Sequence, residues 1–205
     1  MTARHILIGI LLATTLACST STPTGTPGVT NEGKHKVWYK GPELTAEIYY
    51  AWLVRYPGEQ YAMVRLGFAG SKGTTEVKRT NIRLQTPDGT VLAPLDQAGF
   101  REVYGMLRMA IDRNGAWYGP STRFMSSREL CDRWFIYPPA DTEGFTAQRH
   151  AFDSVYVSNF QACGGPLVFP VLQGIQPGRW VLTVELEETT ARIPFEVELV
   201  LENSQ

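Results

Sequence analysis

The most reactive side chains in this 205-residue chain are three thiols, those of Cys18, Cys131 and Cys163. A thiol can be acylated, can pair in a disulfide, or can act as a nucleophile or a metal ligand. Cys18 directly follows an apolar run over 6–17, and only Arg4 supplies a formal charge before that run. The run is too short for a membrane-spanning helix and predicts a secretory signal peptide over residues 1–17.

The residues that end this run resemble the bacterial lipobox. They read Thr14-Thr15-Leu16-Ala17-Cys18, and signal peptidase II cleaves such a motif before a cysteine whose thiol carries diacylglycerol. The lipobox usually has Leu where this chain has Thr15. The resemblance implies a lipoprotein of the cell envelope, anchored through palmitate-type chains on Cys18, because several acyl chains hold a protein on a bilayer stably. Ser19 in place of Asp implies the outer membrane, on its periplasmic or surface face, if the cell is Gram-negative. The alternative is a plain secretory signal without lipid.

Residues 18–36 are rich in Ser, Thr, Pro and Gly and contain one aliphatic residue, Val29. Such a composition cannot bury a core, so the segment after Cys18 is predicted to be a flexible tether. The remaining residues, 37–205, are enough for one domain with a substantial core. The formal net charge is −1, which does not favour a nucleic-acid partner, since such partners select basic surfaces.

Cys131 and Cys163 are the two thiols that remain after acylation. Exported proteins usually fold in an oxidising compartment, so a disulfide between them is predicted. Such a bond would stabilise the fold by about 3 kcal/mol in a chain-entropy treatment. The alternative is a thiol nucleophile or a metal ligand, although neither residue lies in a CxxC motif or beside a histidine.

The residue types needed for acid–base or metal chemistry are scarce. His150 has Asp153 and Ser154 close by in sequence, but a hydrolytic triad needs these groups within hydrogen-bond distance, and on one strand 150 and 153 point to opposite faces. No pattern of metal ligands is present around His35 or His150. The sequence therefore predicts no catalytic residues, no metal site and no cofactor. A hydrolase that works through carboxylates alone stays an alternative.

Aromatic and arginine side chains gather in the 115–135 segment. The candidate ligand-binding residues there are Trp117, Tyr118, Arg123 and Phe124. Exposed rings and arginines are common at carbohydrate- and peptide-binding surfaces. The alternative is that these rings cover one end of the domain and pack under a helix.

Acidic side chains mark the C-terminal part of the chain. Alternation places Glu185, Glu187, Glu196 and Glu198 on the outward face of one hairpin. These carboxylates form either an acidic patch for a basic partner or a solvated face that nearby arginines balance. The candidate arginines are Arg79, Arg83 and Arg192.

The elements that must position these residues are mostly strands. Period-two alternation over 180–186 and 193–201 predicts a C-terminal hairpin, and 46–56 with 61–68 predicts another. A helical stripe follows Asp96 and ends near Asn114. Further strands are predicted at 74–84, 90–95, 133–137, 150–157 and 167–172.

Short strands at regular spacing and one inserted helix predict a mainly β fold, a two-layer β-sandwich with one inserted short helix. The stretch from Leu172 through Pro177, Gly178 and Trp180 to Val184 resembles the penultimate strand of bacterial immunoglobulin-like modules. That resemblance implies an immunoglobulin-like sandwich but no activity. The expected function is a non-enzymatic binding or assembly component of the envelope. Its partners would be the membrane, through the lipid anchor, and another envelope protein or a surface glycan or peptide.

Overall fold

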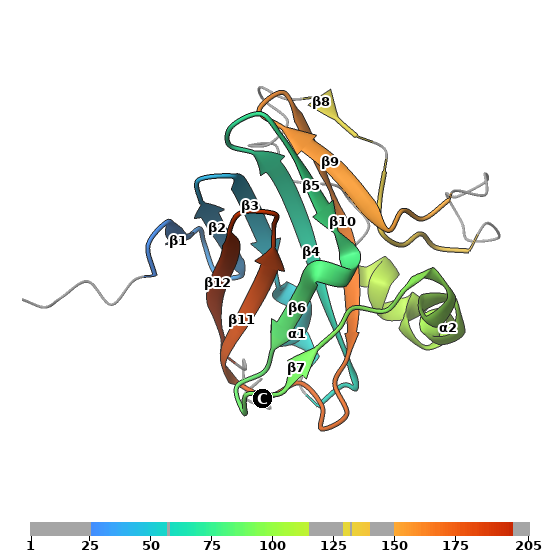
Figure 1. The fold of residues 1–205 in the computed structure, drawn as a ribbon. Helices are drawn as coiled ribbons and strands as arrows, with labels where there is room; N and C mark the ends of the chain where they lie inside the picture. The colour runs from blue at the N-terminus through green and yellow to red at the C-terminus, as the bar shows by residue number, and fades with distance from the viewer. Residues whose placement is uncertain (1–25, 57, 115–128, 132, 140–149, 199–205) are drawn as a thin grey trace, which may run out of the picture.

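Two β-sheets face each other in the computed structural model, which describes residues 26–56, 58–114, 129–131, 133–139 and 150–198 (Figure 1). The six-stranded sheet has the order β1 (Val29–Asn31), β2 (Lys36–Lys40), β3 (Leu44–Tyr49), β4 (Tyr61–Gly70), β10 (Gln161–Pro170) and β8 (Glu129–Leu130). The four-stranded sheet has the order β12 (Thr190–Val197), β11 (Gly178–Glu185), β6 (Ile82–Gln85) and β7 (Val91–Leu92). A third, two-stranded sheet pairs β5 (Thr74–Lys78) with β9 (Ser154–Ser158). The chain is therefore the predicted mainly β sandwich.

The C-terminal hairpin lies where alternation predicts it. β11 and β12 pair antiparallel, with Trp180 opposite Phe195 and Leu182 opposite Ile193. These four side chains are buried, and Trp180 is fully enclosed while its indole N–H donates to the carbonyl oxygen of Gln176 at 3.0 Å. One face of the hairpin thus closes the core and the other meets water, as the period of two requires.

The hairpin predicted over 46–56 and 61–68 is correct in its pairing but wrong in the length of its first strand. β3 pairs antiparallel with β4, with Leu44 opposite Gly70, and β3 ends at Tyr49. The next residues form the short helix α1 (Ala51–Arg55), in which Ala51, Trp52, Leu53 and Val54 are all buried. A short run that is apolar on every side does not distinguish helix from strand, which explains the error.

The strand predicted over 74–84 is two strands in different sheets. A 3₁₀ turn, η1 (Arg79–Asn81), separates β5 from β6. β6 pairs with β11, whereas β5 pairs with β9. The turn is held from both sides, because Arg79 donates its backbone N–H to Asp153 at 2.8 Å and Asn81 donates its side-chain amide to the carbonyl of Glu185 at 3.2 Å. The buried positions change phase across the turn, from Val77 before it to Ile82 and Leu84 after it, with polar residues over 78–81 between them. One strand over 74–84 cannot place all three of these side chains on one face.

The N-terminal limit of the folded part also differs from the prediction. β1 pairs with β2, with Val29 opposite Tyr39, so ordered structure reaches into the segment predicted as a tether over 18–36. Val29 packs against the core as a partly buried residue, while the other β1 residues are exposed. An edge strand needs few apolar side chains, so composition alone does not identify it.

Residues 133–137, predicted as a strand, have no ladder partner among the described residues. The backbone N–H of Trp134 donates to the hydroxyl of Tyr137 at 2.9 Å, and the N–H of Tyr137 donates to the side-chain oxygen of Gln97 at 2.7 Å. Side chains thus satisfy part of this backbone, and the N–H of Phe152 donates to the carbonyl of Trp134 at 3.0 Å. The other predicted strands are present with shifted bounds: 150–157 becomes β9, 167–172 falls partly within β10, and 90–95 reduces to β7.

The predicted helix is present as α2 (Gln97–Asn114) and is capped as expected. The carboxylate of Asp96 accepts from the N–H of Gly99 at 2.8 Å, which satisfies one of the free donors of the first turn. A buried stripe faces the sandwich: Phe100, Tyr104, Leu107 and Ile111. In Figure 1 the helix lies at the side of the sandwich next to β10. Among the described residues, no helix is both long and apolar enough to cross a membrane.

Candidate functional site

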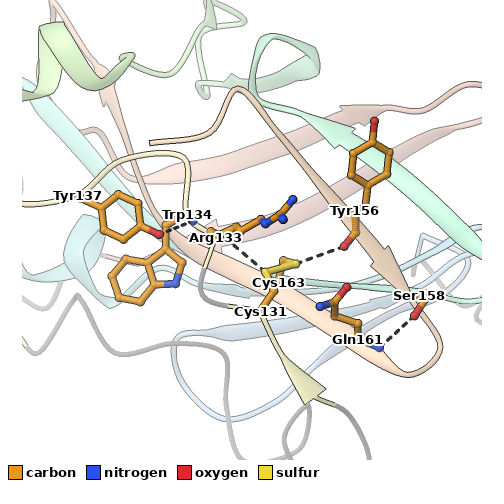
Figure 2. The surroundings of a disulfide bond; sticks show 8 residues. All are labelled: Cys131, Arg133, Trp134, Tyr137, Tyr156, Ser158, Gln161 and Cys163. Carbon is orange, nitrogen blue, oxygen red and sulfur yellow. Dashed lines mark hydrogen bonds between the residues drawn. A yellow bond between two sulfur atoms is a disulfide. The ribbon is translucent and has the colours of Figure 1, made fainter. Parts of the chain in front are cut away.

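The two thiols predicted to pair are bonded. Cys131 and Cys163 form a disulfide with a Cα–Cα distance of 5.1 Å, and Cys163 is 1% exposed. Figure 2 shows the bond between β10 and the residues that follow β8. The N–H of Cys131 also donates to the carbonyl of Ala162 at 2.9 Å, next to the short parallel pairing of β8 with β10. The bond therefore fastens the short strand β8 to the sheet and carries a structural role.

Part of the aromatic segment is described next to this bond. Trp134 stacks on Tyr137 with ring centroids 5.3 Å apart, and Arg133 lies over the ring of Phe152 at 5.2 Å. These contacts are packing contacts within the chain. The four candidate ligand-binding residues themselves, and the candidate lipidation site, lie outside the described residues: Trp117, Tyr118, Arg123, Phe124 and Cys18.

An open cavity of about 520 Å³ lies at a break in the second layer of the sandwich. β6 pairs with β11, but β5, which precedes β6 across η1, pairs with β9 instead. The edge of β5 is therefore separated from the turn that follows β11. Figure 1 shows β5 next to β9 and the β11–β12 turn on the other side of the break. The residues that line the cavity are Glu43, Lys72, Thr74, Thr75, Glu76, Lys78, Asn81, Glu185, Leu186, Glu187 and Glu188.

Carboxylates dominate the charge of this acidic cavity. Five glutamates and two lysines line it. Lys78 forms an ion pair with Glu76 at 3.4 Å, so one of the two cations is already neutralised. The hydroxyl of Ser154, more than Lys78, lowers the pKa of Glu76 from its usual value, which keeps that carboxylate charged in moderately acidic solution.

One carboxylate that lines the cavity, that of Glu43, has an oxygen atom without a hydrogen-bond donor among the described residues. Glu43 precedes β3, and its carbonyl oxygen accepts from the N–H of Ser71 at 2.8 Å and from the hydroxyl of Thr75 at 3.4 Å. Its side-chain Oε1 is buried and has no hydrogen-bond partner among the residues that the structure describes. A buried acceptor without a donor is costly, so this carboxylate is an unsatisfied polar group at the wall of the cavity.

The acidic residues named from the sequence divide between two places. Glu185 and Glu187 line the acidic cavity, whereas Glu196 lines a different hollow beside Arg179. The cavity residues that the sequence analysis did not single out are Glu43, Glu76 and Glu188. No periodicity could have found Glu43 or Glu76, because tertiary structure alone brings their segments to the β11–β12 turn.

Two of the arginines that were expected to balance the acidic face, Arg79 and Arg83, form their contacts with other groups. Arg79 pairs with Asp153 at 3.0 Å, and Arg83 donates to the backbone carbonyl of Thr80 at 2.6 Å. The ion pair with Arg79 also engages the carboxylate of Asp153, the acidic group that lies near His150 in the sequence. Among the described residues, no three His, Cys, Asp or Glu side chains are arranged to hold a metal ion.

Comparison with known proteins gives no relative for this chain. No family model matches the sequence, and no curated protein and no solved structure is significantly similar to it.

Proposed function

We propose that this protein is an exported, lipid-anchored component of the bacterial cell envelope that works by binding, and that its acidic cavity holds a basic segment of another envelope protein. The excess of carboxylates over lysines in an open cavity of about 520 Å³ carries the proposal. Complementary charge selects a partner and accelerates encounter more than it adds raw affinity. The expected complex is therefore sensitive to salt.

The anchor is the second part of the proposal. The apolar run over 6–17 and the lipobox-like residues before Cys18 support it. Acylation of Cys18 would confine the domain to a membrane surface, where partners are also confined. Confinement raises the effective concentration of a partner, so a salt-sensitive contact of modest affinity is sufficient for assembly.

The test is a crosslinking pull-down from the native membrane fraction with four forms of the protein. These are the wild type, Cys18→Ala, the cavity pair Glu185→Gln/Glu187→Gln, and the control pair Glu196→Gln/Glu198→Gln. The two pairs remove the same charge from the same hairpin, but only the first pair lies in the acidic cavity.

We expect the wild type and the control pair to recover the same dominant envelope protein, and the cavity pair to recover much less of it. Cys18→Ala should leave the membrane fraction. Equal recovery by the two pairs would show that the partner binds elsewhere. Recovery of no partner by the wild type would count against a binding or assembly function.

A further inference from the structure

The pairing of β5 with β9 determines which backbone groups of β5 are already used. The antiparallel ladder runs from Thr74 opposite Ser158 to Lys78 opposite Ser154. One step further along this ladder, the N–H of Arg79 donates to the carbonyl of Asp153 at 2.8 Å. Bonded and non-bonded pairs alternate in an antiparallel ladder. Counting back from the bonded pair at Arg79, the bonded residues of β5 are Val77 and Thr75.

The other residues of β5 direct their N–H and C=O groups away from β9. They are Thr74, Glu76 and Lys78, and all three line the acidic cavity. Within the described part of the chain, β5 pairs with no strand other than β9. The cavity is thus bordered by a free strand edge that has donors and acceptors at every second residue.

A free edge of this kind is a template for strand addition. Peptide-binding domains that extend a sheet in this way take their affinity from backbone hydrogen bonds and their specificity from side-chain contacts on alternate residues. Here the side-chain contacts are acidic, because Glu43 lines the same cavity and Glu185, Glu187 and Glu188 lie across it from β5. The edge therefore favours a basic strand and repels an acidic one.

We propose that the free edge of β5 binds an extended segment rich in lysine or arginine as an added antiparallel or parallel strand. The inference rests on the proposed function for the charge of the ligand, and it adds the conformation and the backbone contacts. Strand addition requires no particular sequence between the basic residues, since the N–H and C=O groups of any residue except proline can pair. A partner would be recognised by its charge and its extended form.

The charged side chains of β5 also disfavour pairing of two copies of this chain through this edge. Charged residues on an edge strand discourage edge-to-edge association of identical chains. Glu76 and Lys78 form an ion pair on the edge itself. A second copy would bring five more glutamates to the cavity, whereas a basic segment neutralises them.

The test uses the full chain and three synthetic peptides of equal charge. The parent is an acetylated and amidated octapeptide in which lysine alternates with threonine. The other two carry N-methyl groups on the lysine amides or on the threonine amides. We expect the parent to bind in low salt and at least one methylated peptide to bind about tenfold more weakly, because two or three hydrogen bonds are removed without a change of charge.

Amide hydrogen exchange gives a readout that needs no variant. In the free protein the amides of Glu76 and Lys78 should exchange faster than that of Val77, because only Val77 donates to β9. The parent peptide should protect Glu76 and Lys78 and leave Val77 unchanged. Binding of the parent without protection of these two amides would overturn the proposal.

Two variants of one residue separate the backbone from the charge. Glu76→Pro and Glu76→Val both remove the carboxylate, but only proline removes the N–H at the free edge. We expect Glu76→Pro to bind the parent peptide several times more weakly than Glu76→Val. If Glu76→Pro does not fold, the affinities of the methylated peptides and the amide exchange rates still test whether the ligand binds as an added strand.

The results also distinguish this proposal from the proposed function. One possible result is that all three peptides bind the wild type equally and that Glu185→Gln/Glu187→Gln weakens the binding of all three to the same extent. The acidic cavity would then bind basic segments, but the proposal of strand addition would be wrong. If the parent peptide does not bind wild type in low salt, the basic ligand and the added strand are both wrong.

Discussion

The side chain of Gln97 replaces a strand for the backbone of Tyr137. Its amide N–H donates to the carbonyl of Tyr137 at 2.8 Å, and its amide oxygen accepts from the N–H of Tyr137 at 2.7 Å. Gln97 is the first residue of α2, and Tyr137 is 2% exposed. The pair therefore connects the start of the helix to a segment that has no ladder of its own among the described residues.

Replacing Gln97 by alanine should lower the free energy of unfolding by about 2 kcal/mol, because both backbone polar groups of the buried residue Tyr137 lose their partner. Denaturant unfolding followed by circular dichroism measures the change. The matched control is Gln173→Ala, at an exposed residue, which should alter the free energy by less than about 0.5 kcal/mol. Equal effects at the two positions would contradict the role given to Gln97.

Reduction of the disulfide should destabilise the fold substantially. The bond between Cys131 and Cys163 closes a loop with a sequence separation of 32, so its loss should cost about 3 kcal/mol. Thermal unfolding of the wild type with and without a phosphine reductant measures this cost. The double variant Cys131→Ala/Cys163→Ala is the control and should not respond to the reductant. An unchanged wild-type midpoint in reductant would show that the bond contributes nothing to stability.

Two glycines should respond to alanine in opposite directions. A Cβ on Gly164 would lie 2.2 Å from the carbonyl oxygen of Leu66 in β4, so Gly164→Ala must displace backbone in the central sheet and should cost about 2 kcal/mol or more. A Cβ on Gly105 in α2 meets nothing within 4 Å. Gly105→Ala should therefore stabilise the protein by about 0.5–1 kcal/mol. Melting temperatures of the two variants test both signs, and a stable Gly164→Ala would contradict the close approach.

The lowered pKa of Glu76 predicts a specific dependence of stability on pH. A carboxylate whose native pKa lies below its unfolded value contributes stability that is present above the unfolded pKa, near 4.5, and is lost as the pH falls through the native pKa. The stability difference between wild type and Glu76→Gln should therefore shrink in acid. Because the hydroxyl of Ser154 is the main cause, Ser154→Ala should raise the pKa of Glu76 toward its usual value in an NMR titration. An unchanged pKa would show that this hydroxyl is not the cause.

Local pattern was sufficient for much of the fold. Alternation over 180–186 and 193–201 predicted the C-terminal hairpin because one face of each strand is buried and the other is exposed to water, and that contrast is visible in sequence. The helix after Asp96 was equally visible, since its cap and its apolar stripe are local. The disulfide was predicted from the count of thiols and the predicted export signal, without any knowledge of geometry.

Only tertiary structure decided where the chain changes partners. The apolar positions shift phase at the turn Arg79–Asn81, but nothing in the sequence shows that β5 pairs with β9 and β6 with β11. The acidic cavity exists because of that change of partner. Glu43, Glu76 and Glu187 line this one cavity although they come from distant parts of the chain. Period and composition describe what one segment buries, whereas the pairing of strands depends on segments far apart in sequence. The sequence therefore determined most of the elements and which face of each is buried, and the sheet pairing decided the site.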